Sequence, residues 1–227
     1  VADEGESWGR SPAAVPKLPK IETPVATEDR LARFLPRDNP EGKILLEGFR
    51  LSARADVDPE AHKSLLEFAE ANFKPEVRAL ELAEYGLKRI PQTPEYARER
   101  AGLLSLLSEF GPKDSRTAEV FVDELVKMEH KARPDPALVA SEEERNEALS
   151  LNMQEALAEV AIEGWLMRQQ SFSSSDREAV EIIKSVQNPL VRKHLYLAIV
   201  TKWPESKELL ESALARAGLP VDRIRYE

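Results

Sequence analysis

Five predicted helix starts place a short polar residue directly before a proline, and this pairing constrains the fold more than any other feature. The pairs are Asn39-Pro40, Asp58-Pro59, Thr93-Pro94, Asp135-Pro136 and Asn188-Pro189. The polar side chain can accept a hydrogen bond from the free N–H groups of a helix's first turn, and proline suits the next position because its missing N–H is not needed there. Two capping boxes, Ser141…Glu144 and Ser175…Glu178, carry the same signal. The sequence therefore predicts many helices with defined starts.

Apolar residues between these starts recur at helical spacing. Ala61, Leu65, Phe68 and Ala69 fall on one predicted helix face, and no run of alternating apolar and polar residues competes with this pattern. We predict an all-α protein with helices over residues 27–35, 40–55, 59–72, 75–90, 94–110, 113–131, 141–170, 175–187, 189–203 and 205–217.

The predicted helical segment 141–170 is longer than the others. It is either one long helix or two helices joined near Leu149. One predicted apolar face keeps a three-four rhythm over five turns, through Leu149, Met153, Ala156, Val160, Gly164 and Met167. The final residues, 219–227, are expected to form an extended tail that is either docked or frayed.

Several predicted helix starts are spaced with a regular period. Pro40, Pro75, Pro112 and Pro189 follow one another at steps of 35, 37 and 77 residues, and the last step is about twice 38. Such a period is typical of helix pairs that cannot bury their apolar faces alone and therefore stack on one another. We predict a right-handed α-solenoid of about four to five stacked antiparallel helix pairs, with a compact helical bundle as the alternative.

The stretch Pro75-Glu76-Val77-Arg78, followed by Ala79, Leu82 and Ala83, resembles the Pro-x-Val-Arg-x-x-Ala pattern of HEAT repeats, which are related to armadillo-type helical repeats. Pro189-x-Val191-Arg192 shares the first four positions. The other predicted units lack the Val-Arg pair, and the regularly placed aspartate of HEAT units is not evident. From this resemblance we expect Val77 to face the next layer of helices and Arg78 to bond a neighbouring unit.

The prolines divide the chain into three predicted parts. Residues 1–26 form a proline-rich arm or linker, residues 27–218 form the helical-repeat domain, and residues 219–227 form the C-terminal tail. Proline-rich polar segments favour extended, semi-rigid conformations. The arm is either a tail without fixed structure or a strand that lies along the domain or a partner, with anchors at Trp8, Val15, Leu18 and Ile21.

The charge and composition narrow the classes of partner. The net charge is −9, from 41 acidic and 32 basic residues. Binding to a nucleic-acid backbone relies on a basic surface, so we expect no nucleic-acid partner. The longest apolar run, Leu195 to Val200, is far shorter than the ~20 residues that span a bilayer, so we expect no membrane insertion. There is no cysteine, which leaves the redox compartment open. The N-terminal stretch is similar to the start of many exported proteins after cleavage, which favours an exported or periplasmic location over a cytoplasmic one.

No motif for catalysis, phosphate binding or metal binding emerges from the sequence. The nine glycines form no phosphate-binding loop, the three histidines have no metal-ligand spacing, and we expect no cofactor, metal or small-molecule substrate. Two groups of residues are candidates for contact with a protein partner. Glu155, Glu159 and Glu163 form an acidic stripe at i, i+4, i+8 on the predicted long helix, and Trp165 and Trp203 are scarce large aromatic residues. Core packing is the alternative for both tryptophans, and a solvated outer face is the alternative for the stripe.

Two functions are consistent with these observations. The first is a non-enzymatic protein-interaction module, a scaffold, adaptor or subunit of a larger assembly that presents a helical groove to a protein partner. Its candidate contact residues are Trp8, Leu18, Ile21, Trp165, Trp203, Glu155, Glu159 and Glu163. The second is a carboxylate-based hydrolase on a helical scaffold, which would require two carboxylates about 5–10 Å apart in a deep pocket.

Overall fold

The computed structural model describes residues 24–56, 58–74, 76–129, 141–169 and 176–226, and these residues are almost entirely helical. No strand occurs among them, which confirms the all-α class. None of the described helices is long and apolar enough to cross a membrane. The helices are α1 (Pro24–Ala32), α2 (Pro40–Ala55), α3 (Pro59–Phe73), α4 (Glu76–Arg89), α5 (Ala97–Phe110), α6 (Ser115–Lys127), α7 (Glu142–Arg168), α8 (Asp176–Ser185), α9 (Pro189–Lys202), α10 (Lys207–Arg216) and α11 (Val221–Tyr226), with short 3₁₀ turns η1 (Pro94–Tyr96) and η3 (Pro204–Ser206).

Three of the predicted cap-proline pairs start helices as expected. Asn39 accepts a hydrogen bond from the backbone N–H of Gly42 at the start of α2. Asp58 caps α3, and Asn188 caps α9 by accepting from two backbone N–H groups. In each case proline occupies the first turn. These caps fix where each helix begins, independently of the packing that follows.

The remaining predicted starts have different outcomes. Ser141 and Glu144 form the capping box of α7, and α7 is one continuous helix. Thr93-Pro94 opens the 3₁₀ turn η1 rather than an α-helix. Asp114 caps α6 by accepting from the N–H of Thr117 at 2.8 Å, and α6 begins two residues after the start predicted beyond Pro112. Asp135-Pro136 and Ser175 lie outside the described residues.

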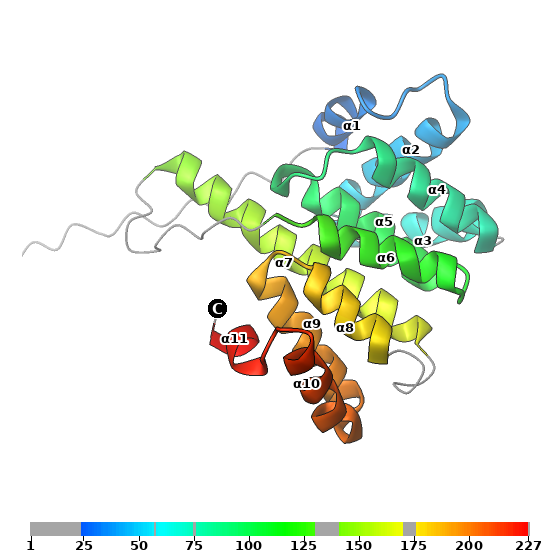
Figure 1. Cartoon of the computed structure of the whole chain (residues 1–227). Helices are drawn as coiled ribbons and strands as arrows, with labels where there is room; N and C mark the ends of the chain where they lie inside the picture. The colour runs from blue at the N-terminus through cyan, green and yellow to red at the C-terminus, as the bar shows by residue number, and fades with distance from the viewer. Residues whose placement is uncertain (1–23, 57, 75, 130–140, 170–175, 227) are drawn as a thin grey trace, which may run out of the picture.

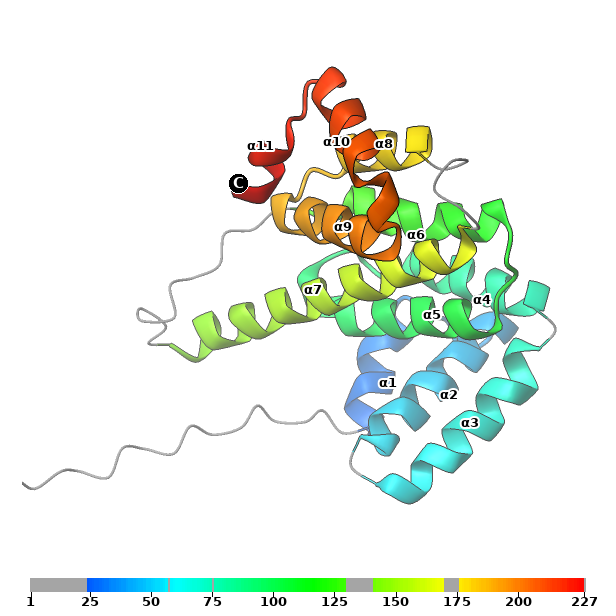
Figure 2. The same ribbon diagram turned by 90° about the horizontal axis from the view of Figure 1, so that it is seen from below.

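Helix α7 lies at the centre of the molecule. Figures 1 and 2 show it between α5 on one side and α9 on the other, and it packs against α5, α6 and α9. Its buried residues form one broad face that covers about half of the helix circumference at 3.6 residues per turn; they are Leu151, Leu157, Ala158, Ala161, Ile162, Trp165 and Leu166. The predicted apolar face was wrong in part, because it placed Met153 and Met167 inward. Met153 is exposed, and Met167 has 59% of its surface exposed.

Close approach between α6 and α7 depends on Gly164. A Cβ atom at this position would overlap the ring of Phe121, which is fully buried on α6. We expect Gly164→Ala to lower the free energy of unfolding by about 1–3 kcal/mol, because a well-packed core cannot accept the added carbon without moving a helix. Urea denaturation followed by circular dichroism measures this loss. Alanine favours a helix more than glycine does, so the substitution also has a stabilising effect. An unchanged or raised free energy of unfolding would show that α6 and α7 move apart at little cost.

Basic side chains close the C-terminal ends of four helices. Arg100 on α5 donates to the carbonyl oxygens of Leu87 and Ile90 at the end of α4. Arg168 on α7 donates to Leu107 at the end of α5, as well as to Pro112 and Gly164. Two cations of α9 act in the same way: Arg192 on Val186 after α8, and Lys202 on Leu166 at the end of α7. These positions suit cations because the last carbonyl groups of a helix are unpaired and carry partial negative charge.

Of the two expectations drawn from the stretch Pro75-Glu76-Val77-Arg78, the one about Val77 was wrong. Val77 does not face the next layer; 60% of its surface is exposed. It lies six residues before the buried Ala83, about 120° around the helix at 3.6 residues per turn, so it falls outside the inner face. Arg78 does contact another helix, because its guanidinium donates to Glu41 of α2 at 3.2 Å.

The C-terminal tail is not extended. Residues Val221–Tyr226 form α11, which packs against α9 and α10. Leu219 and Ile224 are buried and belong to the same hydrophobic core as the rest of the molecule. Gly218, with a φ of 81°, reverses the chain between α10 and this last helix, which is a conformation that glycine adopts without strain.

Candidate functional site

An apolar groove runs between α2, α3 and α5, with a volume of about 240 Å³. Its walls combine partly buried aromatic and aliphatic side chains with a few small polar ones. The lining residues are Leu45, Gly48, Phe49, Ser52, Leu65, Leu66, Phe68, Ala69, Phe73, Gly102, Leu103, Ser105, Leu106, Glu109 and Phe110. Leu66 has 47% of its surface exposed. The groove thus presents apolar surface to solvent, as binding sites in proteins commonly do.

Glycines and phenylalanines give the apolar groove its shape. A Cβ atom on Gly48 would lie 3.2 Å from the ring of Phe68, so the missing side chain lets α3 approach α2 closely. Gly102 on α5 faces the ring of Phe49, and its lack of a side chain leaves space above that ring. At one end of the groove the rings of Phe73 and Phe110 pack with centroids 6.4 Å apart. The lining of the groove therefore includes four phenylalanine rings.

The rim of the apolar groove is polar on the α5 side. Ser105 and Glu109 lie one turn apart on α5, and both are exposed. Glu109 places a negative charge at the edge of an otherwise apolar surface. This combination favours a ligand with apolar side chains and a positive charge beside them.

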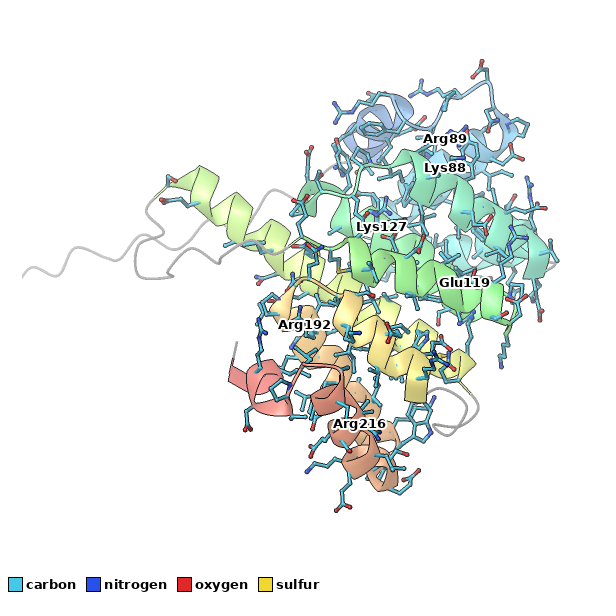
Figure 3. All side chains as sticks on the ribbon, in the orientation of Figure 1. Lys88, Arg89, Glu119, Lys127, Arg192 and Arg216 are labelled. Atoms are coloured by element: carbon cyan, nitrogen blue, oxygen red, sulfur yellow. The ribbon has the colours of Figure 1, made fainter. Side chains whose placement is uncertain are left out.

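A second groove, of about 810 Å³, lies between α4 and α6 and is strongly charged. Figure 3 labels Lys88 and Arg89 on α4 and Glu119 and Lys127 on α6, along this side of the molecule. Its other charged lining residues form ion pairs: Arg100–Glu124, which is buried, Arg116–Glu84 at 2.9 Å and Lys127–Asp123 at 2.9 Å. A hydrolytic pair needs two acids that face one another across a substrate. Three of the four acids in this lining each face a basic side chain, an arrangement that does not favour the hydrolase hypothesis.

The predicted acidic stripe lies along one edge of α7. Glu159 and Glu163 are exposed, and Glu155 is half-buried. Glu155 borders a notch of about 20 Å³ that it shares with His194 of α9 and the side chain of Asn188. A notch of this size has room for about one water molecule. The stripe is a surface feature that remains a prediction as a partner contact. In the part of the chain that the structure describes, no group of three or more histidine or acidic side chains could hold a metal ion.

The predicted tryptophan contacts differ in their placement. Trp165 is fully buried, and its indole N–H donates to Glu178 at 3.2 Å. It therefore acts as a core residue, and we do not carry it forward as a partner contact. Trp203 is half-buried at the C-cap of α9, with the ammonium of Lys202 4.7 Å from its ring centroid. Burial lowers the pKa of Lys202 below the ordinary lysine value. Trp8, Leu18 and Ile21 lie outside the described residues.

Sequence reasoning did not identify the apolar groove. It placed Leu65 and Phe68 on a face of α3, but it treated that face as ordinary core. A signal was present in Leu66, because two adjacent leucines widen the apolar arc of α3 beyond what one neighbouring helix can cover. The glycines of α2 and α5 were the second signal.

Comparisons with protein families, with curated proteins and with solved structures find no match to this chain. The resemblance to HEAT repeats therefore rests on the residues around Val77 and Arg78 alone. The function has to be argued from the groove itself.

Proposed function

We propose that this chain is a non-enzymatic protein-interaction module that receives an apolar segment of a protein partner in the groove between α2, α3 and α5. The observation that carries the proposal is the aromatic wall of this groove, which remains open to solvent while the core beneath it is closely packed. Burying about 200 Å² of apolar surface there would contribute about 5 kcal/mol at 25 cal/mol per Å², before the entropic cost of association. A weak, exchangeable complex is the expected result.

The α-solenoid arrangement is part of the same proposal. Contacts between consecutive helices support it: α4 packs on α5, α6 on α7 and α8 on α9. The proline starts of α2 and α9 also support a regular unit length. In such an arrangement each unit contacts its neighbours, and the surface between units is where partners bind.

The partner's segment is expected to be basic as well as apolar. Glu109 stands at the rim of the groove, and the whole chain carries a net charge of −9. Complementary charge raises the association rate and orients the segment, and it disfavours nucleic acids and other acidic ligands.

The substitution Leu66→Glu tests the proposal. We expect it to abolish retention of a protein partner by the immobilised full chain, because a carboxylate on the wall would have to be desolvated on binding. The matched control is Leu209→Glu on α10, where the leucine is 67% exposed and lies outside the groove. Quantitative mass spectrometry of proteins retained from native extract compares the wild-type chain with both variants.

A protein retained by the wild-type chain and by Leu209→Glu, but lost with Leu66→Glu, would support the proposal. Both leucines are exposed, so both variants should keep the wild-type melting temperature within about 2 °C. If the same proteins bind all three chains, or if none binds the wild-type chain, the apolar groove is not a partner site.

A further inference from the structure

The proline-rich arm has a spacing of apolar residues that matches the apolar groove. Pro12, Val15, Leu18 and Ile21 occur at every third position. A polyproline II helix has three residues per turn, so in that conformation these four side chains share one edge. Residues 12–21 lie outside the described part of the chain, and their sequence alone carries this pattern.

We propose that residues 12–21 of this chain dock in the apolar groove as a polyproline II strand. Proline-rich strands bind grooves lined by aromatic rings, because the strand is already extended and loses little entropy on binding. The groove offers such rings in Phe49, Phe68 and Phe110. Ser52 and Ser105 supply hydroxyl groups for the backbone carbonyl groups of the strand, which form no hydrogen bonds within a polyproline II helix.

The dimensions of the groove fit two of the apolar residues. At about 3.1 Å per residue, positions three apart in a polyproline II helix are about 9 Å apart. The groove extends along α3 from Leu65 to Phe73, a length of about 12 Å at 1.5 Å per residue. Val15 and Leu18 occupy this length together.

The connection to α1 is long enough to place Leu18 in the groove. The strand has to cross α2, because α1 and α3 both pack on that helix and Figure 2 shows α2 between them. Pro24, where α1 begins, is six positions after Leu18, a distance that spans about 19 Å when extended. This exceeds the helix diameter of about 10–12 Å. Ile21 lies on the span that crosses α2.

Charge favours the same placement. Residues 11–21 contain Lys17 and Lys20 and no acidic residue, a net charge of +2. With −9 for the whole chain, −11 remains on the other residues. In a polyproline II helix both lysines lie on a second edge, next to the apolar one. Glu109 at the rim is the acidic side chain that this edge meets.

This inference rests on the proposed function, because the arm occupies the surface that receives the partner. The arm and the partner's segment then compete for one groove. Binding of a partner releases the arm. The apparent association constant for the partner equals the intrinsic constant multiplied by the fraction of chains whose groove is open.

Trypsin cleavage of the folded full chain tests the docking. The bonds after Lys17 and Lys20 lie in the docked segment, and the bond after Arg10 lies outside it. Cleavage follows the population of the open form, so a strand docked in about 90% of molecules is cleaved about ten-fold more slowly than a free one. We expect Leu66→Glu and Glu109→Lys to raise the cleavage rates after Lys17 and Lys20 about ten-fold, each normalised to the rate after Arg10.

The control for the charge reversal is Glu119→Lys on α6, which is exposed and lines the other groove. It should leave the normalised rates unchanged. Equal normalised rates in the wild-type chain and all three variants would overturn the inference. An increase with Glu119→Lys as large as that with Glu109→Lys would also overturn it, because the effect would then come from net charge alone.

Cysteine pairs locate the strand directly, since the chain has no cysteine of its own. A disulfide needs Cα atoms within about 7 Å. Under mild oxidation of dilute protein, the pair Leu18→Cys with Ser105→Cys should form an intrachain disulfide. The pair Leu18→Cys with Ser64→Cys should not, because Ser64 is exposed on α3 but lies outside the groove. Equal yields from both pairs, or a mainly interchain product that places a second copy's arm in the groove, would contradict the inference.

The two proposals can fail separately. If Leu66→Glu abolishes partner retention while the cleavage rates after Lys17 and Lys20 stay unchanged, the groove is a partner site and the arm does not occupy it. If the cleavage rates rise and no partner is retained by any chain, the arm docks and the proposed function fails.

Discussion

Replacing Arg100 by methionine is expected to lower the free energy of unfolding by about 3–5 kcal/mol. Arg100 and Glu124 form a buried ion pair in which the guanidinium Nε donates to the carboxylate at 2.9 Å. Removal of the guanidinium leaves the carboxylate of Glu124 buried without its cation, which is more costly than the loss of the pair as a whole. The carbonyl oxygens of Leu87 and Ile90 lose their donor at the same time. Guanidinium chloride denaturation, with an unchanged m value, measures the loss.

Two further variants separate the causes of this effect. The double variant Arg100→Met, Glu124→Leu should recover much of the stability, because no buried charge is then left unpaired. Arg98→Met, on the same helix, removes an exposed ion pair with Asp56 and should change the free energy of unfolding by less than about 1 kcal/mol. If Arg100→Met and Arg98→Met cost the same, the buried pair contributes no more than a surface one.

Leu195→Asp is expected to lower the free energy of unfolding by more than about 4 kcal/mol. Leu195 is fully buried in α9, and an aspartate there would either remain charged in apolar surroundings or bind a proton. Because α9 contacts α7, α8 and α11, the damage should spread through the C-terminal helices. Hydrogen exchange should show fast exchange over α8–α11, with protection retained over α2–α5.

The control on the same helix is Leu197→Asp. Leu197 is exposed, so this substitution should change the free energy of unfolding by no more than about 0.5 kcal/mol. A retained melting temperature for Leu195→Asp would mean that α9 is not part of the core.

The helix starts were predictable from sequence because they are local. Asn39, Asp58 and Asn188 each bond to a backbone N–H two or three residues ahead, so the interaction is complete within one turn. Asp114 caps α6 by the same chemistry, but the residue that follows it is serine rather than proline, so the helix was predicted after Pro112 while its capping residue was not identified.

The faces of the helices were less predictable because burial depends on neighbours. Val77 follows the apolar rhythm of α4, and it is exposed because no helix covers the edge on which it lies. In α7 the rhythm through Met153 and Met167 is real, but the buried surface is set by α5, α6 and α9 together. Residues 219–227 contain too few residues for a strong helical pattern, and docking against α9 stabilises α11.

The apolar groove could not be predicted, since it exists where no further helix covers the apolar side chains of α2, α3 and α5. Leu66, Phe68 and Phe49 have the composition of core residues, and only the arrangement of α2, α3 and α5 leaves them uncovered. Sequence patterns indicate which side chains are apolar enough to be buried. They do not indicate which of these side chains no neighbouring helix covers.

The basic side chains that close the helix ends have a consequence for the order of folding. In each of these contacts between two helices the hydrogen-bond donor lies on the helix that comes later in the chain. Arg100 on α5 donates to α4, Arg168 on α7 donates to α5, and Lys202 on α9 donates to α7. During synthesis from the N-terminus, the last carbonyl groups of a helix stay bonded to water until the donor helix has left the ribosome. The ends of α4, α5, α7 and α8 are thus completed by helices that are made after them, so these four helices gain their final stability in order from the N-terminus to the C-terminus.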